Sequence, residues 1–262
     1  MAVGVFDSGV GGLTVVQKLN ELMPNESVIY LGDTARVPYG TKSPDTVVRY
    51  ARNCAKVLLK FDITLLVIAC NTASAHALNI LQEELDIPVV GVVEPGAQAA
   101  IRVTKSGKIG VIGTNGTIRS RAYEHALHRL NDQLQVFTQP CPLFVPLADE
   151  GWVSGEIPLL AASHYLTGML ENGIDTLVLG CTHYPLLKAV IGETVGEDVV
   201  LVDSAEETAK LVDDVLGSVG EQPSDKERAY HQFLVSDDAD SFREISSQFL
   251  GYQAENVEWM DF

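Results

Sequence analysis

The chain has 262 residues, a length that fits one large domain or two smaller ones. Apolar residues make up 46% and charged residues 20%, which is typical of a folded globular protein and argues against global disorder. The 35 acidic residues outnumber the 18 basic ones and leave a net charge of −17, which argues against nucleic acids and anionic membranes as partners.

Short apolar runs alternate with helical patterns along the chain. We predict strands, in chain order, at 3–6, 28–31, 65–69, 88–93, 108–112, 134–137, 176–179 and 199–202. Helices are predicted between them, among others at 13–23, 45–60 and 73–84. This alternation predicts βαβ units with parallel strands, and the near-continuous apolar strands are typical of sheets covered on both faces.

Two pairs of segments resemble each other and predict an internal duplication. Residues 66–72 are similar to 177–183, and residues 4–9 are similar to 110–116. The chain would then contain two similar α/β units that face each other. The tail after residue 204 holds 14 acidic and 4 basic residues, and we interpret it as a solvated outer face of helices.

The N-terminus has neither the charged start nor the apolar core of a secretory signal, and no apolar run approaches the roughly 18 residues of a membrane span. The four cysteines contain no CxxC pair, so we expect a cytoplasmic protein without a disulfide framework. Cys54, in mid-helix, and Cys141, between two prolines, are expected to be structural.

Four polar segments stand at the carboxyl ends of predicted strands, where open α/β sheets bind ligands. They are Asp7–Ser8, Cys70–Thr72, Thr114–Thr117 and Cys181–His183. Both Cys70 and Cys181 would lead from a strand into a helix, and helix N-termini stabilise thiolates. Thiols at equivalent positions of two facing units would lie opposite each other across a cleft.

Other interpretations of these residues remain open on the sequence pattern alone. Asp7 and Thr72 would also make good helix N-caps, and Tyr39–Gly40 could form a simple turn. Cys181 and His183 could hold zinc together with Asp7 or Glu150, although the spacing is unlike that of common zinc sites. No dinucleotide or P-loop motif is present, and no lysine at a strand end suggests a Schiff base.

Five longer blocks resemble the signature motifs of the glutamate racemase family. They are, in the family's order and spacing, FDSGVGGLT at 6–14, LGDTARVPYG at 31–40, ACNTAS at 69–74, GVVEPG at 91–96 and GCTHYPLL at 180–187. A further block, VDSAEETA at 202–209, extends the resemblance to about residues 3–208. The chain from about residue 217 onward carries no recognised motif.

The resemblance implies a cofactor-independent racemase that interconverts L- and D-glutamate without a metal and supplies D-glutamate for peptidoglycan. Cys70 would act on D-glutamate, assisted by Asp7. Cys181 would act on L-glutamate, assisted by His183 and Glu150, beside which Asp149 is an alternative. The implied substrate-binding residues are Asp7, Ser8, Tyr39, Gly40, Asn71, Thr72, Thr182 and His183, with Thr114 and Thr117 as further candidates for holding a carboxylate.

The implied fold is α/β: two flavodoxin-like (Rossmann-like) parallel-sheet domains related by a pseudo-twofold axis, with the active site in the cleft between them. Residues 1–95 and 207–262 would form the first domain and 96–206 the second. Partners would be the small-molecule substrate and, as a candidate assembly, a second copy of the chain, with no nucleic acid and no membrane. Alternatives are a racemase of aspartate or another amino acid, a non-catalytic glutamate-binding or partner-inhibiting module, and a thiol redox or zinc protein.

Overall fold

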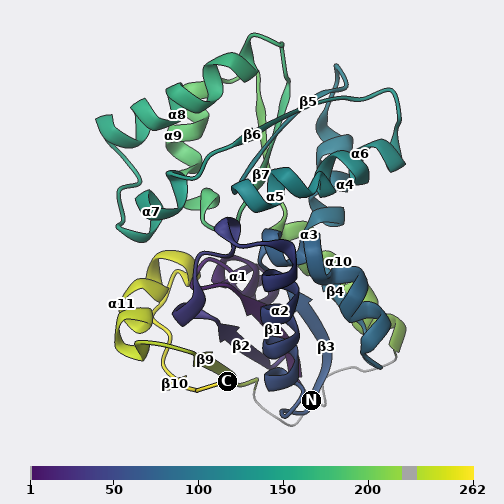
Figure 1. Cartoon of the computed structure of the whole chain (residues 1–262), viewed down its shortest axis with the longest axis vertical. Helices are drawn as coiled ribbons and strands as arrows, with labels where there is room; N and C mark the ends of the chain where they lie inside the picture. Colours follow the sequence, from purple (N-terminus) through teal and green to yellow (C-terminus); the bar gives the residue numbers. More distant parts are fainter. Residues whose placement is uncertain (1, 220–228) are drawn as a thin grey trace. The chain divides into compact units, whose positions relative to one another are not determined.

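The computed structural model describes residues 2–219 and 229–262, and the chain divides into two compact units (Figure 1). Unit 1 consists of Met1–Val92 and Ala205–Phe262, and unit 2 consists of Val93–Ser204. Each unit is built around its own parallel β-sheet, so the predicted fold class of two parallel-sheet α/β domains is confirmed.

Unit 1 contains a six-stranded sheet in the order β10-β9-β2-β1-β3-β4, and all of its strand pairs are parallel. The strands are β1 (Ala2–Asp7), β2 (Val28–Gly32), β3 (Ile63–Ile68), β4 (Val89–Gly91), β9 (His231–Val235) and β10 (Val257–Trp259). The helices are α1 (Leu13–Leu22), α2 (Pro44–Leu58), α3 (Asn71–Glu84), α10 (Ala205–Val219) and α11 (Ala239–Leu250), with short 3-10 helices η1 (Thr34–Arg36) and η2 (Tyr39–Thr41).

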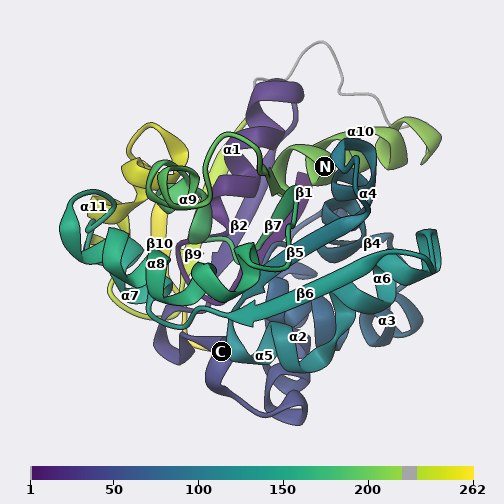
Figure 2. The same ribbon diagram turned by 90° about the horizontal axis from the view of Figure 1, so that it is seen from above.

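Helices cover both faces of this sheet, which is why its strands are almost wholly apolar. Figure 2 shows α2 and α3 on one face and α1, α10 and α11 on the other. Helix α2 begins where Ser43 accepts a hydrogen bond from the Thr46 backbone N–H and Pro44 occupies the first turn. Its inward residues Ala51, Cys54 and Leu58 are fully buried, and Cys54 lies in the core as predicted.

The interpretation of the tail as an outer face of helices is wrong in part. Its strands β9 and β10 extend the sheet of unit 1 beyond β2, and Phe233, Leu234 and Val235 are buried. The short apolar run of β9 pairs with β2 and thereby satisfies the backbone groups of an edge that would otherwise remain open. Residues 220–228 of the same tail lie outside the described residues.

Unit 2 contains a four-stranded parallel sheet in the order β6-β5-β7-β8. The strands are β5 (Lys108–Gly113), β6 (Gln135–Pro140), β7 (Thr176–Gly180) and β8 (Val200–Asp203). The helices are α4 (Val93–Val103), α5 (Asn115–Ser120), α6 (Ala122–Leu130), α7 (Phe144–Asp149), α8 (Glu156–Leu170) and α9 (Lys188–Val195), with the 3-10 helix η3 (Tyr184–Leu187).

The two sheets share one strand order. The order β2-β1-β3-β4 in unit 1 corresponds to β6-β5-β7-β8 in unit 2, as expected for a duplicated flavodoxin-like unit. Strand β3, which precedes Cys70, therefore holds the same place in its sheet as β7, which precedes Cys181. Within residues 2–219 and 229–262, no helix is long and apolar enough to cross a membrane.

Asp175, at the amino end of β7, accepts hydrogen bonds from the segment between α4 and β5. Its carboxylate accepts hydrogen bonds from the hydroxyls of Thr104 (2.7 Å) and Thr176 (2.9 Å) and from the backbone N–H groups of Lys105 (2.7 Å) and Ser106 (2.6 Å). Burial opposes ionisation here, but the hydrogen bonds outweigh it and hold the pKa of Asp175 well below its ordinary value.

We expect Asp175→Asn to lower the free energy of unfolding by about 1–3 kcal/mol at neutral pH, because charge-assisted hydrogen bonds are lost. Because the pKa of Asp175 is lower in the folded than in the unfolded state, its carboxylate stabilises the fold fully at pH values above the unfolded-state pKa of about 3.9. This stabilisation is lost as the pH falls through the folded-state pKa. Urea unfolding at several pH values should therefore show the two proteins converging on acidification. A difference that stays constant with pH would contradict this assignment.

Candidate functional site

The first part of the candidate site is at the carboxyl end of β1 in unit 1. Asp7 is fully buried, and its Oδ2 accepts a hydrogen bond from the Gly9 backbone N–H at 3.0 Å. The Tyr30 hydroxyl donates to the Gly9 carbonyl at 2.6 Å and holds the same turn from the neighbouring strand. A Cβ atom on Gly12 would come within 2.5 Å of the Asp7 Cβ, so a glycine is needed at this close approach.

Cys70 follows the adjacent strand β3 and caps helix α3. Its Sγ accepts a hydrogen bond from the Ala73 backbone N–H at 3.5 Å and lies 3.8 Å from the Ser8 hydroxyl oxygen. The amide donors and the positive dipole end of α3 therefore stabilise negative charge on this sulfur. The alternative roles as N-caps for Asp7 and Thr72 are not observed, since Gly12 caps α1 and Cys70 caps α3.

Two further pairs of predicted substrate-binding residues follow the carboxyl ends of strands in unit 1. Asn71 and Thr72 form the buried first turn of α3. Tyr39 and Gly40 form most of η2, which packs against α3. The Tyr39 hydroxyl donates to Asp33, so the groups that this segment could offer a ligand are backbone groups.

Cys181 in unit 2 is placed differently from the prediction. It follows β7, but the next helix is the four-residue η3, which begins three residues later at Tyr184. Its immediate neighbour is a side chain instead, because the His183 Nδ1 lies 3.9 Å from the Cys181 Sγ. Thr182 and His183 are both buried, and their side chains approach within 3.4 Å.

His183 joins Cys181 to a carboxylate. Its Nε2 lies 3.1 Å from the Oδ1 of Asp149, the last residue of α7. Burial lowers the pKa of His183, but contacts with Asp149 and Cys181 outweigh burial and raise it well above its ordinary value. The contacts therefore favour the imidazolium form of His183, and an imidazolium is a charged hydrogen-bond donor suited to a negatively charged sulfur.

The structure corrects the carboxylate that was expected beside His183. Asp149 makes the contact, whereas Glu150 follows the end of α7 and is exposed. One residue along a helix turns a side chain by about 100°, so neighbouring carboxylates cannot both point the same way. The helix register that decides between them was not evident in the sequence.

Thr114, like Cys181, follows a strand at the carboxyl end of unit 2's sheet, and Thr117 lies in the first turn of α5 that Thr114 caps. Thr114 follows β5, whose last residue Gly113 pairs with Gly180, and it accepts a hydrogen bond from the Thr117 backbone N–H at 3.2 Å. The side chains of Thr114 and Thr117 also contact each other, because their hydroxyl oxygens lie 3.1 Å apart. In the part of the chain that the structure describes, no group of three or more His, Cys, Asp or Glu side chains is arranged to hold a metal ion.

The model of the Asp/Glu/hydantoin racemase family matches residues 3–212, about four-fifths of the chain. The chain belongs to this family. As a member of a racemase family it is an isomerase. It is 58% identical to the glutamate racemase of Geobacter metallireducens over 95% of its own length and 93% of that protein.

Solved structures of similar proteins agree with this family assignment. A glutamate racemase isoform from Bacillus anthracis matches with a TM-score of 0.95 and 43% identity, covering 99% of this chain and 97% of that one. The glutamate racemase of Francisella tularensis, solved in complex with D-glutamate, matches with a TM-score of 0.93 and 39% identity over the same shares.

Sequence reasoning missed one buried acidic residue of this racemase-family chain. Asp33 follows β2, the strand next to β1, and is fully buried. The rule that singled out Asp7, a polar residue directly after an apolar strand, applies equally to Asp33. Its partner Ser236 lies more than 200 residues away in the unrecognised tail, and no sequence signal joined the two.

Proposed function

We propose that this protein is a cofactor-independent glutamate racemase that inverts Cα with two cysteines, Cys70 and Cys181. The observation that carries the proposal is their equivalent placement. Each thiol is buried and follows the corresponding strand of a parallel sheet with the same strand order. Relatives named glutamate racemase, one of them solved with D-glutamate, support glutamate as the substrate.

The proposed reaction is one proton removal and one proton delivery. The thiolate of one cysteine takes the Cα proton, and the electron pair of the broken C–H bond remains on the carbanion, which the carboxylate stabilises. The thiol of the other cysteine then protonates Cα from the opposite face. The two sulfurs exchange protonation states in each inversion, and the mechanism requires that both reach the same Cα.

The surroundings of each sulfur suit this chemistry in different ways. The α3 amides stabilise negative charge on Cys70, and Asp7 lies nearby as the assisting carboxylate. On the other side, His183 in its imidazolium form would stabilise negative charge on Cys181, and Asp149 holds the His183 ring. We propose that Ser8, Asn71, Thr72 and Thr182, with the backbone of Tyr39–Gly40, bind the substrate's polar groups, and that the product is cytoplasmic D-glutamate for peptidoglycan synthesis.

The test is racemisation in D2O without added cofactor. Purified protein is incubated with L-glutamate, and optical rotation and Cα deuterium are followed by polarimetry and NMR. We expect loss of rotation together with incorporation of one deuterium per inversion. No exchange with either glutamate enantiomer would reject the function, and exchange with aspartate alone would make the protein an aspartate racemase.

A further inference from the structure

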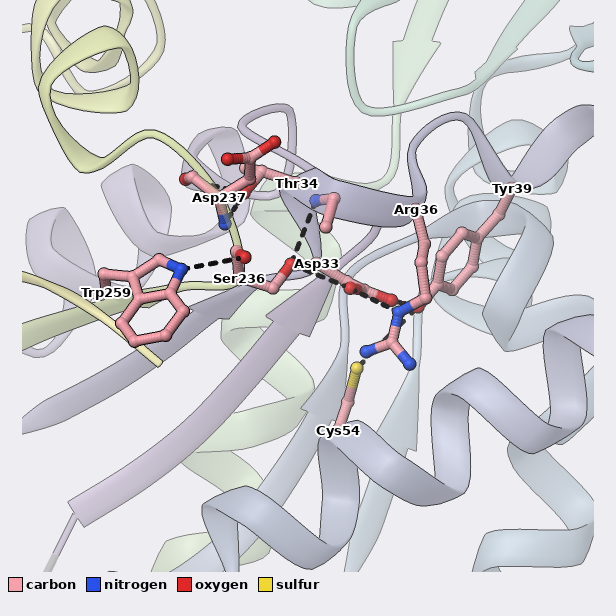
Figure 3. Close-up of polar contacts among 9 residues, drawn as sticks. Asp33, Thr34, Arg36, Tyr39, Cys54, Ser236, Asp237 and Trp259 are labelled. Carbon is pink, nitrogen blue, oxygen red and sulfur yellow. Dashed lines mark hydrogen bonds and ion pairs between the residues drawn. The ribbon is translucent and has the colours of Figure 1, made fainter. Parts of the chain in front are cut away.

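Asp33 is the centre of a buried polar network at the carboxyl end of β2 (Figure 3). Its Oδ1 accepts hydrogen bonds from the Arg36 Nε at 2.8 Å and from the Ser236 hydroxyl at 2.9 Å. Its Oδ2 accepts a hydrogen bond from the Tyr39 hydroxyl. One carboxylate thus joins the end of β9 to two points on the segment that follows β2.

The Tyr39 hydroxyl is fully committed to this network. The side chain is 1% exposed, its hydroxyl lies 3.7 Å from the Cys54 Sγ, and its ring packs against Tyr50 with centroids 5.5 Å apart. Burial, with Cys54 and Asp33 nearby, raises the pKa of Tyr39, so the hydroxyl stays protonated and donates to Asp33. The position of η2 therefore depends on Asp33.

The network also reaches Asp7, the candidate catalytic residue at the end of the neighbouring strand β1. The backbone N–H of Asp33 donates to the carbonyl of Asp7 at 3.0 Å. On the other side, the Ser236 hydroxyl accepts from the Ala35 N–H at 3.0 Å, and Thr34 exchanges hydrogen bonds with the backbone of Asp237. The segment from β2 to η2 is therefore held between Asp7 and the end of β9.

Arg36 supplies the positive charge that a buried carboxylate requires. It pairs with Asp33, and its guanidinium carbon lies 4.7 Å from the ring centroids of both Tyr50 and Phe262. A charge-assisted pair with stacked aromatic contacts has few alternative geometries, so it orders the segment that it joins. The arrangement gives the rigidity that backbone groups need when they bind a ligand.

We propose that Asp33 is a positioning residue, which sets the backbone of Tyr39–Gly40 for substrate binding through the Tyr39 hydroxyl and Arg36. The inference rests on the proposed function, in which that backbone binds glutamate. It assigns a role to a buried carboxylate that would have no direct contact with substrate. It also makes the tail strand β9 part of the binding apparatus through Ser236.

The central variant is Asp33→Asn. The amide keeps the shape but presents N–H donors where the carboxylate accepted them, so Tyr39, Arg36 and Ser236 cannot all be satisfied. We expect KM for glutamate to rise about tenfold and kcat/KM to fall by about 10- to 100-fold, since small displacements of binding groups have effects of that size. The equilibrium constant between enantiomers is 1, so kcat/KM must fall equally in both directions.

Asp175→Asn is the matched control, because it removes an equally well hydrogen-bonded carboxylate at the amino end of β7, away from Cys181. Both variants should lose stability in urea, but only Asp33→Asn should raise KM. If the KM of Asp33→Asn equals that of the wild type while the wild type racemises glutamate, the positioning role is rejected and the function stands. An inactive wild type would instead reject the function.

A double-mutant cycle tests the route through Tyr39. Tyr39→Phe removes only the hydroxyl and should raise KM less than Asp33→Asn does, because Arg36 remains held. If Asp33 acts through that hydroxyl, the double variant should have nearly the KM of Asp33→Asn alone. If the increases in KM caused by the two single changes multiply in the double variant, the two residues act independently, and this result would contradict the inference.

Discussion

Cys70→Ser and Cys181→Ser are each expected to reduce glutamate racemisation by about a thousandfold, the scale of a lost acid–base group. A serine hydroxyl is far less acidic than a thiol, so it neither forms the base nor returns the proton at neutral pH. Rates with L- and D-glutamate, followed by circular dichroism, measure the loss. Cys141→Ser is the matched control, because Cys141 is buried and has no place in the proposed reaction.

Isotope exchange distinguishes the two cysteines from each other. In Cys181→Ser, Cys70 can still remove the Cα proton of D-glutamate, exchange it with D2O and return deuterium to the same face. D-glutamate should therefore acquire deuterium without forming L-glutamate, and Cys70→Ser should show the same behaviour with L-glutamate. Near wild-type racemisation in either variant would refute the two-base assignment.

Asp149→Asn is expected to shift the alkaline limb of the kcat/KM profile to lower pH. The contact with Asp149 helps to raise the pKa of His183, whereas burial lowers it. Without the carboxylate His183 loses its proton at a lower pH, and activity that needs the imidazolium falls as the pH rises through that lower value. At mildly alkaline pH we expect a loss of about 10- to 100-fold.

The comparison of Asp149→Asn with Glu150→Gln decides which carboxylate acts. Both changes remove one negative charge, and the two residues are adjacent. Kinetics measured from mildly acidic to alkaline pH should show a displaced limb for Asp149→Asn alone. A displaced limb for Glu150→Gln and an unchanged one for Asp149→Asn would restore the sequence-based assignment.

Local patterns were sufficient to predict most of the fold. Each of the eight predicted strands overlaps a strand of the structure, because a buried parallel strand is a short apolar run that is visible without its neighbours. The same patterns placed Asp7, Cys70 and Cys181 at the ends of strands. The short strands β9 and β10 were missed because they follow a long acidic segment, and only pairing with β2 and with each other makes them strands.

The sequence alone determined the fold class, the family resemblance and the residue types at the strand ends, because each depends on residues that are close together in the chain. Tertiary structure decided the partners of those residues. It turned Asp149 rather than Glu150 toward His183, and it brought Ser236 to Asp33 across 203 positions of sequence. Side-chain direction and strand neighbours follow from how whole elements pack, and no local pattern encodes that packing.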